Sequence, residues 1–150
     1  MNLEDRLYSE TDDSCGICGM RGPDLLTIHH IYKRQGKRHE DYDNQIVLCY
    51  NCHIRYHEKR ERRRLPTRRQ IVDRKRHLIM KTLTQYGLSA LKSASRQPQG
   101  IVGFPFLLYH LVELGCMKQK ERQMGYDDLV VTARFIATPK GRALIRRWFP

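Results

Sequence analysis

The sequence lacks the features of several classes of protein. It has no run of 18 apolar residues, so no segment is expected to span a membrane. Acidic residues are few, with 16 Asp and Glu against 28 Lys and Arg, and the net charge is +12. The opening residues, MNLEDRLYSETDD, are acidic and do not have the pattern of a secretory signal. We therefore expect a protein of the cytoplasm (host cytosol or nucleoid) with a polyanionic partner such as nucleic acid.

Composition divides the chain into three stretches. Residues 1–13 are acidic, without a core pattern, and are expected to be loosely ordered. Residues 14–64 contain four of the five cysteines and five of the seven histidines. Residues 65–150 are basic, helical in pattern and poor in metal ligands. We expect the middle stretch to carry the chemistry and the last to bind DNA or to mediate dimerisation.

Apolar spacing and turn residues predict a mixture of strands and helices. Extended segments are expected at Leu25–His30, Gln45–Leu48 and Leu129–Ala137. Helices are expected from Asn51 to about Arg64, over Arg68–Tyr86 with Thr67 as N-cap and Gly87 as C-cap, over Phe104–Leu114, and over Pro139–Trp148.

Two CxxC pairs, Cys15/Cys18 and Cys49/Cys52, are separated by 30 residues. A CxxC turn lets both thiolates reach one ion, and two such turns complete a tetrahedral site. In a reducing compartment this spacing predicts a structural zinc ion, with a redox pair or buried free thiols as alternatives. The remaining cysteine, Cys116, is interpreted as a core or surface thiol.

The histidines require a second site, because four cysteines already satisfy one zinc ion. His53 and His57 are four residues apart on a predicted helix and share one face. His29 and His30 are adjacent on a predicted strand, so they point to opposite faces and only one of them joins the same ion. A metal on neutral histidines with open positions suits catalysis, and a free histidine beside it suits a general base.

The segment from Cys15 to His57 resembles the HNH endonuclease family, also called ββα-metal or His-Me finger nucleases. The resemblance rests on CGIC, IHHI at residues 28–31, Asn44 within DNQIVLC, CYNCH, and His57. It implies an α+β protein: a zinc-stapled ββα-metal nuclease motif, followed by a mainly helical C-terminal domain.

The resemblance also implies a role for each residue of the motif. His30 would deprotonate the attacking water, and His29, His53 and His57 would bind one divalent ion. Asn44 would hydrogen-bond the loop near His30 and hold that imidazole in place. Many members of the family have an aspartate where His29 stands. The all-histidine set is a variant of the family pattern and leaves the choice of ion more open: Mg²⁺ or Mn²⁺ is expected, with Ni²⁺ or Zn²⁺ as alternatives.

Basic residues cluster after the predicted catalytic helix. Between Lys59 and Arg76 there are ten basic and two acidic residues. They form either a solvated helix face or a phosphate-binding surface. His39 is expected to be a solvated or DNA-facing loop residue. The expected nucleic-acid contacts are Lys33, Arg34, Lys37, Arg38, Arg55, Lys59, Arg62 and Arg63.

The C-terminal sequence VVTARFIATPKGRALIRRW resembles the last strand and closing helix of winged-helix DNA-binding domains. The alternative is a helical domain that packs on the nuclease or forms a dimer.

The leading hypothesis is a metal-dependent HNH endonuclease that hydrolyses DNA, duplex or branched, to 5′ phosphate and 3′ hydroxyl ends. A phage or mobile-element setting fits, and a homodimer would account for a double-strand cut. The alternatives are a non-catalytic zinc module that binds nucleic acid and an assembly protein whose arginines bind DNA during packaging.

Overall fold

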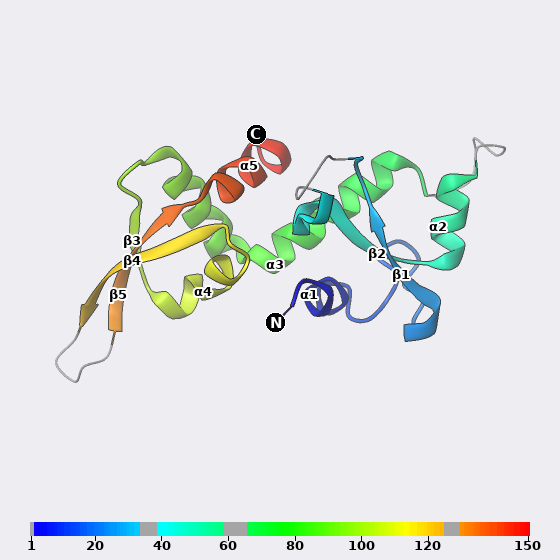
Figure 1. The fold of residues 1–150 in the computed structure, drawn as a ribbon, viewed down its shortest axis with the longest axis horizontal. Helices are drawn as coiled ribbons and strands as arrows, with labels where there is room; N and C mark the ends of the chain where they lie inside the picture. Colours follow the sequence, from blue (N-terminus) through cyan, green and yellow to red (C-terminus); the bar gives the residue numbers. More distant parts are fainter. Residues whose placement is uncertain (1, 34–38, 59–65, 125–129) are drawn as a thin grey trace. The chain divides into compact units, whose positions relative to one another are not determined.

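The chain forms two compact units, Met1–Thr82 and Leu83–Pro150. The computed structural model describes residues 2–33, 39–58, 66–124 and 130–150 (Figure 1). Within these ranges helices and strands are mixed, which confirms the expected α+β class. The first unit extends past the 64/65 boundary drawn from composition, because it includes the first half of a long helix, α3 (Arg68–Arg96).

The first unit is built on an antiparallel hairpin followed by a helix. Strands β1 (Leu26–His30) and β2 (Gln45–Cys49) pair in a register that runs from Leu26 opposite Cys49 to His30 opposite Gln45. Helix α2 (Tyr50–His57) follows β2 directly (Figure 1). This is the expected ββα arrangement. The helix ends at His57 and not near Arg64, because Glu58 adopts an extended conformation and its N–H closes the last turn on the Ile54 carbonyl.

Short helices flank this hairpin. They are α1 (Leu3–Glu10), η1 (Pro23–Leu25) and η3 (Tyr42–Asn44). The expectation that residues 1–13 are loosely ordered is wrong, because Asn2 caps α1 by accepting a hydrogen bond from the Asp5 amide at 2.8 Å. Leu7 and Glu10 of α1 are buried.

A buried ion pair joins α1 to α3. Lys75 is fully buried, and its Nζ donates to Glu10 at 2.5 Å. The Tyr42 hydroxyl donates to the same carboxylate, and the Lys75 ammonium lies 3.9 Å from the centre of the Tyr42 ring. Burial lowers the pKa of Lys75 although Glu10 and Asp43 act in the opposite direction. Lys75 lies in the basic run, yet it stabilises the fold and is not available to phosphate.

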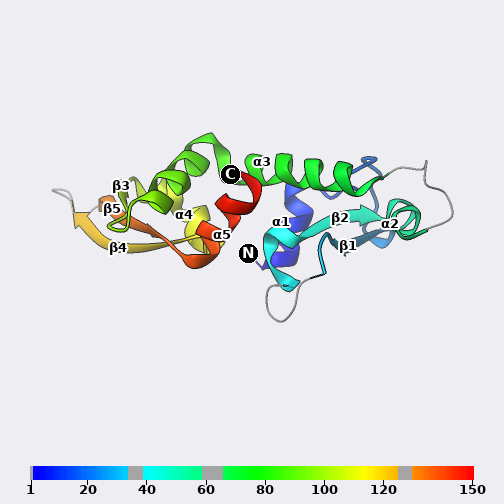
Figure 2. The same ribbon diagram turned by 90° about the horizontal axis from the view of Figure 1, so that it is seen from above.

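The second unit is a three-stranded antiparallel sheet with helices (Figure 2). Strand order is β3-β5-β4, and the elements are β3 (Ile101–Gly103), α4 (Pro105–Glu113), β4 (Met117–Met124), β5 (Val130–Ala137) and α5 (Pro139–Trp148). The helices α4 and α5 and the strand β5 lie where the sequence predicts them. The strands β3 and β4 were not predicted. The likeness to winged-helix domains stays a prediction.

Helix α3 is interrupted at Thr84, whose backbone has φ 59° and ψ 163°. The Thr84 hydroxyl accepts a hydrogen bond from the Gly87 amide at 3.1 Å, so it caps the second segment. Gly87 is therefore inside a helix and is not the expected C-cap. A side chain at Gly87 would have its Cβ 2.7 Å from Nε2 of His110, and that nitrogen donates to the Leu83 carbonyl at 3.0 Å.

Among the described helices, none has both the length and the apolar composition that a membrane span requires.

Candidate active site and metal centres

The two CxxC pairs converge on one point in the first unit. The four sulfur atoms of Cys15, Cys18, Cys49 and Cys52 lie within 4.8 Å of one another, and none is in a disulfide. The Cys18 and Cys49 sulfurs are 3.6 Å apart. In a tetrahedral zinc site with Zn–S bonds of about 2.3 Å, sulfurs are separated by about 3.8 Å. This four-cysteine cluster has the dimensions of a structural zinc site.

The pKa values of the clustered thiols also indicate that a cation would stabilise the site. Burial opposes the ionisation of Cys15, but hydrogen bonds from the Cys18, Cys49 and Ile17 amides outweigh it and lower the pKa of Cys15 to about 7. Burial and then the charge of Cys15 raise the pKa of Cys52, and burial raises that of Cys18. One thiolate therefore suppresses the next, and a bound divalent ion would remove this repulsion.

The second cluster joins β1 to α2. His29, His53 and His57 place one ring nitrogen each within 4.8 Å of the others. The ring of His29 lies 5.2 Å from that of His53 and 5.3 Å from that of His57, and the two helix histidines are 4.7 Å apart. The three residues run from buried His29 through half-buried His53 to exposed His57. The cluster thus opens toward solvent on one side, as a site for a ligand must.

His29 has the properties of a metal ligand. It is 3% exposed, and its Nε2 is buried without a hydrogen-bond partner among the described residues. Burial, followed by the nearby histidines, lowers its pKa to about 4. Burial also lowers the pKa of His53. Both rings are therefore neutral at pH 7, which is the form that binds a metal, and a cation would satisfy the orphaned nitrogen.

His30 points to the other face of the strand, as the alternation predicts. It belongs to a separate group with His39 and Glu40. Its Nε2 lies 3.3 Å from Oε1 of Glu40 and 3.0 Å from Nε2 of Gln45, and the Gln45 amide donates to Glu40 at 2.6 Å. The ring of His39 stacks on that of His30 at 3.8 Å.

The expectation that His39 is a solvated residue is therefore wrong, and the alternative that it faces DNA stays a prediction. It is half-buried against His30, and its Nδ1 is covered. Sequence reasoning also missed Glu40 and Gln45. Gln45 faces His30 across the β1–β2 pair, so the register of the hairpin was the signal that could have found it.

Asn44 fastens the chain that follows His30. Its amide nitrogen donates to the Tyr32 and His39 carbonyls, each at 3.0 Å, and its side-chain oxygen accepts from the Tyr32 amide at 3.1 Å. Its backbone carbonyl accepts from Ile31 at 2.8 Å. Asn44 is fully buried, so these bonds replace contacts with water.

Only some of the expected nucleic-acid contacts lie in the described ranges. Lys33 and Arg55 are exposed, the latter on α2 between His53 and His57. The others lie outside the described residues: Arg34, Lys37, Arg38, Lys59, Arg62 and Arg63.

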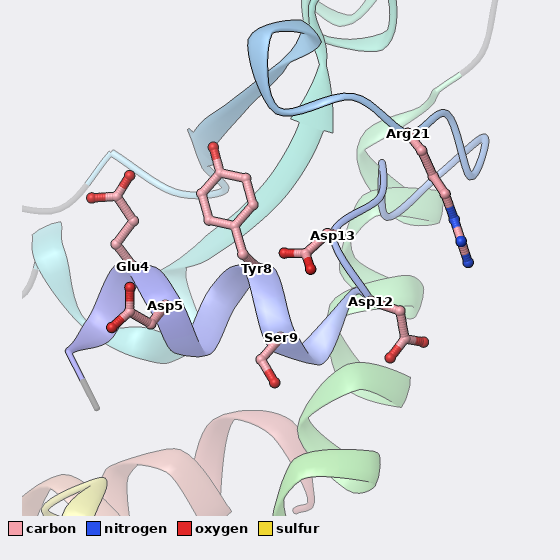
Figure 3. Close-up of a pocket in the computed structure, with 7 residues that line it drawn as sticks. All are labelled: Glu4, Asp5, Tyr8, Ser9, Asp12, Asp13 and Arg21. Atoms are coloured by element: carbon pink, nitrogen blue, oxygen red, sulfur yellow. The ribbon is translucent and has the colours of Figure 1, made fainter.

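A pocket of the first unit lies elsewhere and has the wrong charge for DNA. It has a volume of about 820 Å³ and is lined by α1 and the residues after it (Figure 3). Its charged side chains are Arg21 and the four carboxylates Glu4, Asp5, Asp12 and Asp13. Four carboxylates against one arginine would repel a phosphate backbone. The histidine clusters, and not this pocket, are the candidate active site.

The first unit contains a small hairpin and helix with four converging cysteines and a histidine cluster where strand and helix meet, an arrangement compatible with a structural zinc ion. In agreement, residues 15–59 match the sequence model of the HNH endonuclease family. These residues therefore form an HNH endonuclease domain, and members of that family are generally nucleases. Comparisons with curated proteins and with solved structures found no match.

Proposed function

We propose that this chain is a metal-dependent endonuclease that hydrolyses DNA phosphodiester bonds. The observation that carries the proposal is that one strand of an HNH domain, β1, directs His29 and His30 to opposite faces and so into two different groups of side chains. His29 joins His53 and His57 in a set of metal ligands, and His30 stands on the other face beside Glu40. A nucleic-acid-binding module would need neither group.

His30 is the proposed general base. A carboxylate oxygen of Glu40 lies 3.3 Å from its Nε2, and the amide nitrogen of Gln45 lies 3.0 Å from the same atom. The neutral imidazole would take a proton from water. Glu40 then stabilises the imidazolium that forms, and Asn44 holds the adjacent chain through Tyr32.

The proposed reaction is hydrolysis of a phosphodiester bond by one water molecule. The hydroxide left after His30 takes the proton attacks phosphorus, and the bond to the 3′ oxygen breaks. Products are a 5′ phosphate and a 3′ hydroxyl, whose proton comes from solvent. A divalent ion on the histidines, when bound, supplies a positive charge for the phosphate and for the leaving oxygen.

The residues of the histidine cluster indicate which divalent ion it would bind. Three imidazoles without a carboxylate suit first-row transition ions, since Mg²⁺ prefers oxygen ligands. The donor set of His29, His53 and His57 therefore supports Ni²⁺ or Zn²⁺ more than Mg²⁺ or Mn²⁺. A structural zinc on the four cysteines is separate from this ion.

DNA is the proposed substrate because the net charge is +12 and the elements that carry the site also carry exposed cations. Arg55 is exposed on α2, on the face opposite His53 and His57, and Lys33 is exposed two residues after Ile31. Cations at these positions would contact phosphates and orient a duplex without selecting its sequence. The homodimer stays a prediction.

Cleavage of supercoiled plasmid tests the proposal. Wild type, His30→Ala and His77→Ala are compared with Mg²⁺, Mn²⁺, Ni²⁺ and Zn²⁺, and their zinc content is measured. His77 is an exposed histidine on α3 whose Nδ1 lies 2.8 Å from the Asp73 carbonyl, so its replacement is the matched control. We expect wild type and His77→Ala to cut and His30→Ala to lose at least about 100-fold in rate, the usual worth of a general base.

Two outcomes would count against the proposal. Equal cutting by all three proteins would remove His30 from the mechanism. Binding of plasmid, branched DNA and RNA without cleavage by any protein and with any ion would favour the zinc-containing binding module. Zinc retained in all three proteins would show that the fold is intact in either case.

A further inference from the structure

A pocket of the second unit gathers basic side chains from two helices. It has a volume of about 300 Å³ and lies between the end of α3 and α5. Lys92 and Arg96 are one turn apart on α3, and Arg142 and Arg146 are one turn apart on α5. Residues four apart lie on one face of a helix, so each helix presents a pair of cations to the same pocket.

None of these four cations forms an ion pair with a side chain in the described part of the chain. No acidic side chain of the described residues lines the pocket. Arg134, by contrast, pairs with Glu121 in the same unit at 3.2 Å. Like charges that converge on one small pocket repel each other unless an anion offsets them.

Helix dipoles account for part of this arrangement only. Arg96 and Arg146 lie in the last turns of their helices, where a cation is favoured. Lys92 and Arg142 lie a turn earlier, beyond the reach of that effect. The Lys92 ammonium is instead held 5.5 Å from the centre of the buried Phe149 ring, at the edge of the same pocket.

A neutral donor completes the set. Ser95 lines the pocket, and its Oγ is buried without a hydrogen-bond partner among the described residues. Serine inside a helix usually donates to the carbonyl one turn back. This hydroxyl does not, so it is left as a donor beside four cations.

We propose that this pocket, defined by Lys92, Ser95, Arg96, Arg142 and Arg146, binds phosphate groups. Arginine pairs with phosphate oxygens through two parallel hydrogen bonds, and lysine and serine supply single donors. The site is distinct from the histidine clusters and from the basic run after α2. Resting on the proposed nuclease function, we assign the phosphates to the nucleic-acid backbone, which the second unit would hold while the first unit cuts.

Two double variants of the full chain test the pocket. Arg96→Gln/Arg146→Gln removes two exposed cations of the pocket. Lys120→Gln/Lys140→Gln removes two exposed cations of the same unit outside the pocket and is the matched control. All measurements use protein that holds one zinc ion per chain, as the four-cysteine cluster requires, with no free divalent ion in the buffer. Binding is then measured without cleavage, and a failed nuclease hypothesis does not affect the result.

The readouts are duplex binding by fluorescence anisotropy and inorganic phosphate binding by the fluorescence of Trp148, the single tryptophan, which lies on α5 two residues from Arg146. We expect the pocket variant to lose about tenfold in duplex affinity at 0.1 M salt and to lower the salt slope by about 2, one for each phosphate contact. The control should stay within about twofold. Phosphate should alter the fluorescence of wild type and control only, and duplex should compete with it.

The same measurements distinguish a nucleic-acid phosphate from a free phosphate. If phosphate binds wild type and not the pocket variant, while both bind duplex equally, the site is upheld and its occupant is a free phosphate or a small phosphorylated ligand. If phosphate has no effect and the two double variants lose duplex affinity equally, only overall charge matters and the pocket is refuted.

Discussion

Replacement of Lys75 by methionine removes the ammonium of a buried ion pair with little change in volume. Glu10 would be left in the interior, 4% exposed, with the Tyr42 and Thr82 hydroxyls as its remaining partners. Loss of one member of a buried pair costs about 3–5 kcal/mol in the free energy of unfolding. Because two hydroxyls still donate to Glu10, we expect the lower end, about 3 kcal/mol.

The matched control is on the same helix. Lys81 forms an ion pair with Asp12 at 3.0 Å, but its side chain is 56% exposed. Exposed pairs contribute about 0–1 kcal/mol, so Lys81→Met should change the free energy of unfolding by less than about 1 kcal/mol. Urea unfolding followed by circular dichroism, at a fixed zinc concentration, measures both variants.

A double variant separates the pair from general damage to the core. Glu10→Gln with Lys75→Met leaves no buried charge, and Gln retains an oxygen that can accept from Tyr42. The double variant should therefore lose less stability than the two single variants added together. Equal losses below about 1 kcal/mol for Lys75→Met and Lys81→Met would refute the structural role of the pair.

Three further outcomes follow from the site. In protein whose histidine cluster is metal-free, the free energy of unfolding should fall by about 3 kcal/mol as the pH drops from 6.5 to 4. The reason is that His29 takes up a proton in the unfolded chain, while the folded ring, with its pKa of about 4, does not. Denaturation at several pH values should show that the free energy of unfolding of His29→Gln depends less steeply on pH. Cys49→Ser should lose the zinc that Cys116→Ser retains, as measured by elemental analysis; zinc in both would dismiss the four-cysteine site. Asn44→Ala breaks three side-chain hydrogen bonds of about 1 kcal/mol each, so hydrogen exchange of the Tyr32 amide should accelerate about 100-fold. An unchanged exchange rate would show that Asn44 does not hold this segment in place.

The metal-binding part of this protein could be predicted because its signals are local. CxxC turns place two thiolates by their own geometry, and His53 and His57 share a helix face at any position in a fold. Alternation along β1 likewise separates His29 from His30. These patterns need only the chain's own backbone, so they were visible without tertiary structure.

The sequence thus determined the α+β class, the HNH motif, the four-cysteine cluster and the division of the histidines into two groups. Only the tertiary structure placed Glu40, Gln45 and His39 around His30, since their approach depends on the register of β1 with β2 and on the chain that Asn44 fastens. Tertiary contacts alone ordered α1, whose Glu10 pairs with a lysine 65 residues away, and paired the polar strand β4 with β5. Long-range pairing leaves no periodic mark in either partner, and for that reason these features could be found only in the folded chain.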